Sequence, residues 1–476
     1  MKGIISWGVY LPYRRLDRST IAAVAGQGGG KGTRTVASFD EDPVTLAVEA
    51  GRLALHPVPA AHPRQLLFGA ISPAYAEKTN ATVVHAALRL DDDAAAFDLG
   101  LSARSAFGGV LLALAGGATT LVTAGDVRTG LPGSGEESNN GDAGAAVLVG
   151  EDSPDAPVVA ELLATSSVTA EFIERWRTPG DFRTKLWDDK YSEVTYTPLG
   201  QRVWKDALAN AGVEASQIDL VAVSAPSSRV AGAVGAKLGA AKVVDNFAAT
   251  IGLTGCAQPL LLLGALLEQA IAEGASTVAL VSVADGADAI VLRLTPAAAS
   301  FQAARPVAEQ AAGGAPLPYG KFLSWRGQLH IEPPRRPEPG RISASASARS
   351  TDWKYGFVAS RDRETGMVHM PPSRVSADGL RTDEMDPAPM ADVQGTIATF
   401  TVDRLAYSPS PPIVFAVVDF DGGGRLPVEL TDTDASEVEI GKRVEMTFRL
   451  LFTADGLPNY FWKGRLVRDT TPGEEA

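Results

Sequence analysis

The chain has 476 residues, of which 45% are hydrophobic and 21% are charged, and its formal net charge is −13. This length accommodates two or three domains with sizeable cores, and the composition is that of a globular protein. The acidic balance argues against nucleic acid as a partner, because binding phosphate groups requires clustered Lys and Arg.

The cysteine and histidine content restricts the chemistry further. The single cysteine, Cys256, excludes an intrachain disulfide and a cysteine-based zinc site, and the five histidines are scattered, so we expect no bound metal. The stretch at 1–12 lacks the charged and apolar regions of a signal peptide. The longest apolar run, at 259–267, is too short to span a bilayer, so we expect a cytoplasmic protein that does not enter the membrane.

Residues 1–295 alternate apolar runs with alanine-rich helical patterns. Continuous apolar runs separated by helices predict an α/β fold whose sheet is buried on both faces. The strands are predicted at 3–11, 65–71, 119–125, 143–150, 218–225, 241–248, 276–284 and 288–294.

The two halves of this segment repeat one order of elements. A helical pattern at 43–55 precedes a strand at 64–73, and a helical pattern at 200–212 precedes a strand at 218–226. Each half then closes on a strand rich in Gly, Ala and Asp. The repetition predicts an internal duplication, with a first half at 1–165 and a second half at 166–295.

The sequence changes character after residue 295. Residues 296–350 are rich in Ala, Pro, Arg and Ser and are predicted to be a linker, in which the aromatic helical pattern at 319–327 docks on a neighbour. Residues 395–476 alternate apolar and polar residues between glycine-rich turns, which predicts a small β-barrel.

Several stretches of residues 1–295 together resemble a known family. They are similar to archaeal-type hydroxymethylglutaryl-CoA (HMG-CoA) synthases, which belong to the thiolase superfamily alongside ketoacyl synthase III. The resemblance implies a duplicated, five-layered αβαβα fold that acts on acyl-CoA thioesters. It is carried by GIISWGVYLPYRRLDRSTIA at 3–22, SFDEDPVTLAVEAGRLAL at 38–55, GDAGAAVLV at 141–149, EFIERWRTPGDF at 171–182 and VSVADGADAIVL at 281–292.

The C-terminal part resembles a second family, the acyl-CoA-associated proteins in which a short zinc ribbon precedes an OB fold. The matching stretches are YGFVASRDRETGMVHMPPSRV at 355–375 and the run at 395–432. The resemblance implies a zinc-ribbon-like segment at 351–394 and an OB fold at 395–476. Such proteins accompany a thiolase or a synthase, and help to bind CoA or hold the complex together.

The catalytic groups that the first resemblance implies are missing. Condensation in this superfamily uses an acylated cysteine thiolate, a base and hydrogen-bond donors for the oxyanion. The cysteine position is held by Ala103, the histidine position by Ser224, the asparagine position by Leu253 and the glutamate position by Ile71. We therefore expect no intact set of catalytic residues.

Two substitutes for the missing nucleophile remain open. Ser102 and Ser105 lie near the cysteine position, but a serine would need an activating base. Cys256 precedes a predicted helix, whose N-terminus lowers the pKa of a thiol. A relocated nucleophile is one interpretation of Cys256, and a small core residue is the favoured one.

The zinc ribbon shows a parallel loss. Asp362 and Thr365 stand at the first pair of cysteine positions, and Val375 and Asp378 stand at the second pair. No thiolate is present, so zinc binding by this route is excluded.

Three functions follow as hypotheses. The first is a non-catalytic or rewired HMG-CoA-synthase-like subunit of an acyl-CoA thiolase or acyltransferase complex, which scaffolds the complex and helps to bind CoA. It would form a homodimer, as the superfamily does, and would pair with a separate thiolase. The second is an active acyl-CoA enzyme with non-standard catalytic residues. The third is a binder of acyl-CoA or single-stranded nucleic acid through the OB fold. No covalently bound cofactor is expected; CoA or acyl-CoA is the expected ligand.

Overall fold

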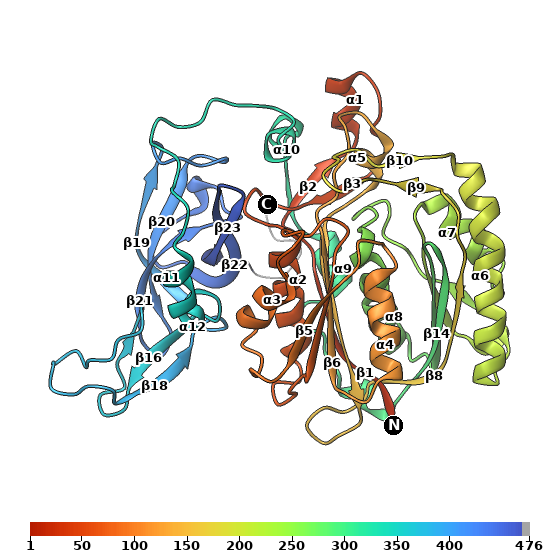
Figure 1. Cartoon of the computed structure of the whole chain (residues 1–476), viewed down its shortest axis with the longest axis horizontal. Coiled ribbons are helices and arrows are strands. Elements are labelled where there is room, and N and C mark those ends of the chain that lie inside the picture. The colour runs from red at the N-terminus through yellow and green to blue at the C-terminus, as the bar shows by residue number, and fades with distance from the viewer. Residues whose placement is uncertain (469–476) are drawn as a thin grey trace, which may run out of the picture. The chain divides into compact units, whose positions relative to one another are not determined.

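A computed structural model describes residues 1–468 of the chain (Figure 1). The chain divides into two compact units. The first unit comprises Met1–Ala37, Asp42–Val84 and Leu90–Gln328. The second unit comprises Ser38–Glu41, His85–Arg89 and the chain from Leu329 onward.

The first unit is built on a ten-stranded sheet with the order β12-β11-β13-β14-β8-β1-β7-β6-β4-β5. The strands of the first half are β1 (Lys2–Tyr10), β4 (Gln65–Gly69), β5 (Ala95–Leu99), β6 (Thr120–Asp126) and β7 (Ala143–Glu151). Those of the second half are β8 (Ala160–Thr169), β11 (Leu220–Ser224), β12 (Lys242–Val243), β13 (Thr277–Val283) and β14 (Gly286–Leu294).

The strand order confirms the predicted duplication. Outward from the central β1–β8 pair, the order is β1-β7-β6-β4-β5 on one side and β8-β14-β13-β11-β12 on the other. The pairing pattern also repeats, because β6–β7 and β13–β14 are antiparallel whereas β4–β5 and β11–β12 are parallel. The predicted boundary between 165 and 166 lies inside β8, so the second half begins with that strand at Ala160.

The predicted strand at 241–248 is reduced to β12, which has two residues. Both residues of β12 are exposed, and the chain then turns. Asp245 Oδ1 accepts a hydrogen bond from Phe247 N at 3.0 Å, and Phe247 has a φ of +55°. The apolar run therefore ends in a turn held by a side chain, which the pattern of hydrophobic residues does not reveal.

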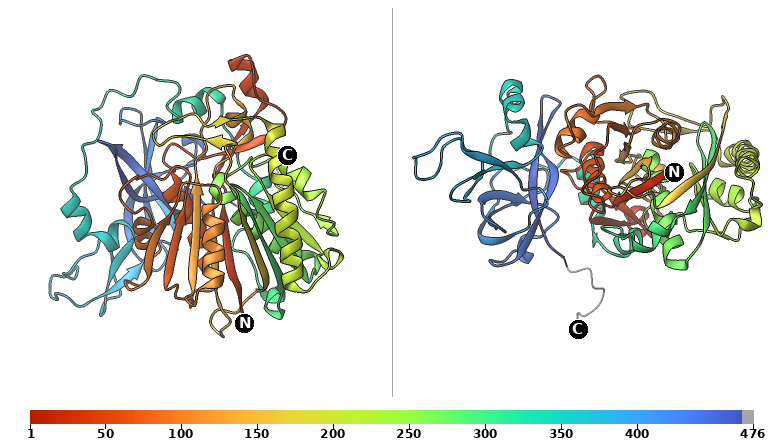
Figure 2. Two further views of the ribbon diagram at one scale, coloured as in Figure 1. Left: turned by 45° about the vertical axis from the view of Figure 1, so that its right-hand side comes forward. Right: turned by 90° about the horizontal axis from the view of Figure 1, so that it is seen from below.

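Helices cover both halves of the sheet (Figures 1 and 2). Helix α2 (Pro43–Leu55) packs on β1, β6 and β7, and α6 (Asp189–Ala211) packs on β8 and β14. Helix α4 (Ser105–Ala115) packs on β4, β6 and β7, and it contacts α8 (Gln258–Glu273), which packs on β11 and β13. The outer helices and the central α4–α8 pair give the layers of the predicted α/β fold.

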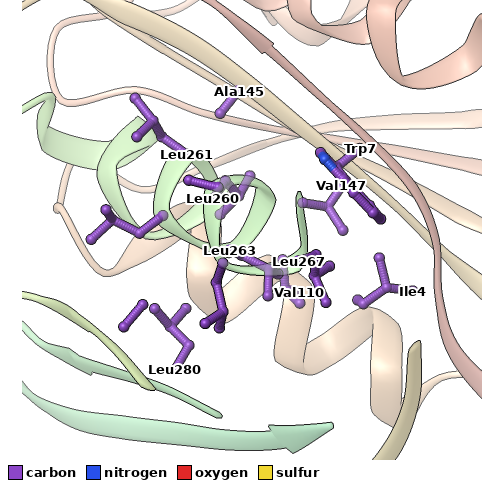
Figure 3. Close-up of a cluster of buried hydrophobic side chains, with 14 of the residues drawn as sticks. Ile4, Trp7, Val110, Ala145, Val147, Leu260, Leu261, Leu263, Leu267 and Leu280 are labelled. Atoms are coloured by element: carbon purple, nitrogen blue, oxygen red, sulfur yellow. The ribbon is translucent and has the colours of Figure 1, made fainter. Parts of the chain in front are cut away.

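Helix α8 lies at the centre of a large hydrophobic core (Figure 3). Its leucines at 260–263, 266 and 267 are all fully buried, and the four consecutive leucines make the first half of the helix apolar on every side, as expected of a core helix. Gly264 allows close approach, because a Cβ there would lie 2.9 Å from Trp7 Cδ1. The helical stretch Gly255–Glu273 is long and apolar enough to cross a membrane, but 72% of it is buried inside the protein.

Part of the predicted linker at 296–350 belongs to the first unit. Residues up to 328 contain α9 (Val307–Ala312), β15 (Ala315–Pro316) and α10 (Tyr319–Trp325). The predicted docking helix is α10, whose Tyr319 and Phe322 are buried against Leu16 and Ile21. Aromatic side chains that bury against an apolar cluster offset the entropy of ordering a Pro-rich and Ala-rich segment.

The other elements of residues 1–328 are short. They are β2 (Arg14–Asp17), α1 (Ser19–Ala25), β3 (Thr33–Val36), α3 (Ala81–Ala87), α5 (Gly135–Asn139), β9 (Arg175–Trp176), β10 (Lys185–Leu186) and α7 (Ser228–Gly235).

The second unit contains the predicted β-barrel. Its strands close in the order β19-β20-β21-β23-β22. They are β19 (Gly395–Asp403), β20 (Ile413–Phe420), β21 (Arg425–Leu430), β22 (Arg443–Ala454) and β23 (Leu457–Leu466). Residues 469–476, the end of the predicted OB fold, lie outside the described residues.

Short elements precede the barrel. They are α11 (Ala344–Arg349), α12 (Thr351–Lys354), β16 (Val358–Asp362), β17 (Val368–His369) and β18 (Met385–Pro389), of which the strands form a sheet in the order β17-β16-β18. Phe357 is fully buried, and its ring stacks on Trp353 at 5.1 Å and on Trp462 at 5.7 Å between ring centroids. The aromatic side chains before β16 therefore serve packing within this unit.

Candidate functional site

Three of the four positions at which the sequence resemblance predicts catalytic residues lie on segments that meet. Ile71 follows β4, Ala103 precedes α4, and Leu253 precedes the turn Gly255–Ala257 that leads into α8. A Cβ at Gly69 would lie 2.9 Å from Cys256 Sγ and 3.2 Å from Ala106 Cβ, which shows how closely the end of β4, the first turn of α4 and the start of α8 approach.

The fourth position, Ser224, ends β11 and is buried. The turn that follows is tied to the others by polar contacts. Arg175 Nη2 donates to Pro226 O at 3.2 Å, and Arg175 Nη1 lies 3.1 Å from Glu136 Oε2. Glu136 in turn accepts from the side chain of Asn140 at 3.0 Å, and Asn140 forms a β-bridge with Leu253.

Asp126, at the end of β6, joins two of the converging turns. It is fully buried, and its Oδ1 accepts from Ile71 N at 2.8 Å while its Oδ2 accepts from Cys256 N at 2.6 Å. Burial raises the pKa of this carboxyl to about 6, although Arg128 opposes the shift. Asp126 cannot be singled out from the sequence, since an aspartate after a buried strand is a common pattern.

Arginines line the same region. Arg128 Nη2 lies 3.7 Å from Glu136 Oε2, and Arg177 Nη2 donates to Ile71 O at 3.4 Å and to Ser72 Oγ. Burial, together with the nearby Arg128, lowers the pKa of Arg177. Guanidinium groups bind anions and hold carbonyl oxygens, but they do not serve as nucleophiles or as bases near neutral pH.

Asp142, just before β7, binds two further arginines. Its Oδ1 accepts from Arg128 N at 2.7 Å and lies 3.2 Å from Arg34 Nη2, and its Oδ2 pairs with Arg326 Nη2. Asp142 and Arg34 are fully buried. Burial lowers the pKa of Arg34 to about 10, and the charge of Asp142 opposes this shift. The carboxylate thus holds β3, the loop after β6 and the end of α10 together.

The segment at the cysteine position is also held by charge. Arg104 forms a bidentate pair with Asp288 of β14, at 2.7 Å from Nε and 2.8 Å from Nη2, and Asp288 is almost fully buried. Ser102 Oγ donates to Asp285 Oδ2 at 2.7 Å. Ala103 between them carries only a methyl group, so this segment supplies ion pairs where the sequence resemblance predicts a thiol in the family.

Cys256 lies in the core. Its side chain is fully buried, and burial together with the nearby Asp126 raises its pKa well above the ordinary range. The thiolate is the nucleophilic form of cysteine, and this environment disfavours it. The geometry is that of a structural thiol.

The positions expected for zinc thiolates lie around the β17-β16-β18 sheet. Asp362 ends β16, and Asp378 lies in the loop that follows β17. Both carboxylates contact Arg381, whereas Val375 is 44% exposed. Within residues 1–468, no three His, Cys, Asp or Glu side chains are arranged to hold a metal ion.

Comparison with known proteins places both units. Residues 388–449 match the family described as ChsH2, C-terminal OB-fold domain. Over 37% of its length, the chain is 32% identical to the hydroxymethylglutaryl-CoA synthase of Archaeoglobus fulgidus, of which it covers 54%. The chain thus spans about half the length of the curated relatives that it matches.

Solved structures show the same fold. An HMG-CoA synthase complexed with CoA aligns with a TM-score of 0.56 at 17% identity, over 72% of this chain and 92% of that one. The 3-oxoacyl-[acyl-carrier-protein] synthase III of Aquifex aeolicus VF5 aligns with a TM-score of 0.52 at 20% identity, over 62% of this chain and 100% of that one. The chain therefore combines a domain of thiolase-like α/β fold, similar to HMG-CoA synthase and 3-oxoacyl-[acyl-carrier-protein] synthase III, with a C-terminal OB-fold domain that matches the ChsH2 type.

Proposed function

We propose that the chain is a non-catalytic, HMG-CoA-synthase-like subunit of an acyl-CoA thiolase or acyltransferase complex. It scaffolds the complex and helps to bind the CoA substrate, while a separate thiolase supplies the cysteine. The observation that carries this proposal is the segment 102–104: the sequence resemblance predicts the nucleophile at Ala103, and the structure pairs the adjacent Arg104 with the buried Asp288.

The chemical groups around the predicted catalytic positions support the loss of thioester chemistry. Thioester exchange needs a thiolate, a base of suitable pKa and donors for the oxyanion. The segments around Ala103, Ile71 and Leu253 present a methyl group, apolar side chains and already-paired charges. The chain's one thiol is buried, with its pKa raised. Restoring catalysis would require several changes together.

The proposed homodimer is supported by an edge of the sheet. Strand β5 ends the ten-stranded order, and its ladder in the described residues is with β4 alone. Phe97 on β5 is 54% exposed and Leu101 beyond it is 57% exposed. An exposed edge with apolar side chains is a template for pairing with another chain, and a two-fold axis would join the β5 strands of two copies.

Binding of CoA is proposed from the relatives. One solved HMG-CoA synthase with this fold is complexed with CoA. The half-buried Arg177, beside the Ile71 turn, is a cation that such an anionic ligand would meet in this chain. Cytoplasmic location remains an expectation.

The test is to incubate the purified chain with acetyl-CoA and to measure its intact mass. We expect no acyl adduct, together with saturable binding of CoA by calorimetry. An adduct would overturn the proposal in favour of an active enzyme. Matched Cys256→Ala and Ser102→Ala variants would identify the acylated group. Ser102 is included because its hydroxyl donates to the carboxylate of Asp285. Co-purification with a thiolase from the source cells would support the partner role.

A further inference from the structure

Two loops beside the β17-β16-β18 sheet are each folded around their own side-chain oxygens. In the first loop, Asp362 Oδ1 accepts from Glu364 N and from Thr365 N, both at 2.9 Å. In the second loop, Asp378 Oδ1 accepts from the backbone N of residue 380 at 3.0 Å, and Ser376 Oγ accepts from that of residue 381 at 3.1 Å. Each loop thereby directs one carboxylate oxygen away from its own backbone.

The guanidinium of Arg381 lies between the two loops. Its Nη2 is 3.1 Å from Asp378 Oδ2 and 3.5 Å from Asp362 Oδ2, and its Nη1 is 2.6 Å from Glu364 Oε2. The Arg381 side chain is 16% exposed and the Asp362 side chain is 1% exposed. One cation therefore contacts three carboxylates. The most buried of them, Asp362, lies in the first loop, whereas Arg381 ends the second loop.

The charges of this cluster require a cation. Three carboxylates at one place repel one another, and a buried carboxylate without a counter-charge is costly. Backbone N–H groups and Arg381 together hold the pKa of Asp362 below its usual range, and the Ser376 hydroxyl does the same for the pKa of Asp378. Both groups thus stay ionised at neutral pH. The buried Asp362 depends on the guanidinium for its counter-charge, whereas the side chains of Asp378 and Glu364 are 40% and 70% exposed and are also solvated.

We infer that Arg381 is a built-in structural cation, whose planar guanidinium fastens the 362–366 loop to the 376–381 loop as a bound metal ion would. Asp362 and Asp378 occupy two of the four positions at which the sequence resemblance places zinc thiolates. Guanidinium suits this task because its donors lie in one plane and reach several carboxylates at once, whereas an ammonium is a compact point charge.

A double-mutant cycle tests the inference on the full chain. We expect Arg381→Met to lower the melting temperature of the second unit by several degrees, and Arg381→Lys to recover only part of the loss. We expect the double variant Asp362→Asn/Arg381→Met to be no less stable than Arg381→Met alone, because neither buried charge remains unpaired.

The matched control is Arg374→Met. Arg374 pairs with Asp383 at 2.6 Å and 2.7 Å, but the side chains are 80% and 55% exposed. An exposed pair contributes little, so we expect almost no shift. The inference is overturned if Arg381→Met behaves like Arg374→Met. It is also overturned if the double variant loses as much stability as Arg381→Met and the single variant Asp362→Asn together. If Arg381→Met alone fails to fold, the lysine and double variants still decide the question.

Discussion

Replacing Asp142 by asparagine removes the one charge that two arginines share in the first unit. Arg34 is fully buried, and Arg326 is 6% exposed at its side chain. The variant leaves both guanidinium groups facing a neutral amide, whose NH2 group cannot accept their hydrogen bonds. Removing one partner of a buried ion pair costs about 3–5 kcal/mol, so we expect a loss of about 4 kcal/mol in the free energy of unfolding.

The expected loss is large enough to measure by two routes. At about 2 cal/mol/K of unfolding entropy per residue, 4 kcal/mol lowers the melting temperature of a unit of roughly 300 residues by about 6 °C. Five of the seven tryptophans lie in the first unit, so urea unfolding followed by tryptophan fluorescence reports mainly on it. The control is Asp92→Asn, at an exposed position. A midpoint for Asp142→Asn equal to that of the control would refute the reasoning.

Three further predictions concern buried groups. The pKa of Asp126 is raised from 3.8 to about 6, so between these pH values the folded state keeps a proton that the unfolded chain has lost. As the pH rises from about 4 to about 6, this residue therefore lowers the free energy of unfolding by about 1.4 kcal/mol per pH unit. Urea unfolding at pH 4.5 and pH 6 measures this change in the free energy of unfolding for the original chain and for Asp126→Asn. Between these pH values the variant should lose less stability than the original chain, and an equal change in both would contradict the prediction. Cys256 should react with a maleimide reagent only as the protein unfolds, whereas labelling as fast as that of a free thiol would place it in contact with solvent. Gly8→Ala should lower the free energy of unfolding by about 3 kcal/mol, because the new Cβ would lie 2.3 Å from a backbone oxygen of α2. Gly108→Ala, which has open space around it in α4, should raise the free energy of unfolding by about 0.5–1 kcal/mol. Equal melting temperatures of the two variants would show that the contact at Gly8 is relieved.

The sequence was sufficient for the strands that are buried on both faces. The runs at 119–125, 143–150 and 276–284 became β6, β7 and β13, because continuous apolar stretches have few other ways to be buried. The barrel strands followed from their alternation and their glycine-rich turns. The run at 241–248 failed as a strand because side-chain hydrogen bonds around Asp245 turn the chain, which depends on local geometry rather than on hydrophobicity.

The polar network of the candidate site could not be predicted in the same way. Arg34 and Asp142 are 108 residues apart in the chain, and Asp126 and Cys256 are 130 residues apart. No periodic pattern links such partners, since they meet only when the sheet has formed. The sequence resemblance predicts that catalytic groups are missing at Ala103, Ile71, Ser224 and Leu253, a prediction that stays a prediction. It gave no sign that Arg104 and Asp288 would be paired beside Ala103.

The two halves of the large sheet are joined by a very short seam. Strands β1 and β8 are in register at only two residue pairs, Gly3 with Glu161 and Ile4 with Ala160. The backbones approach so closely there that a Cβ at Gly3 would lie 2.0 Å from Ala160 O. A methyl group at Gly3 would therefore collide with the backbone of β8 at the place where the two halves of the sheet meet, so the close approach of the halves requires a residue without a side chain.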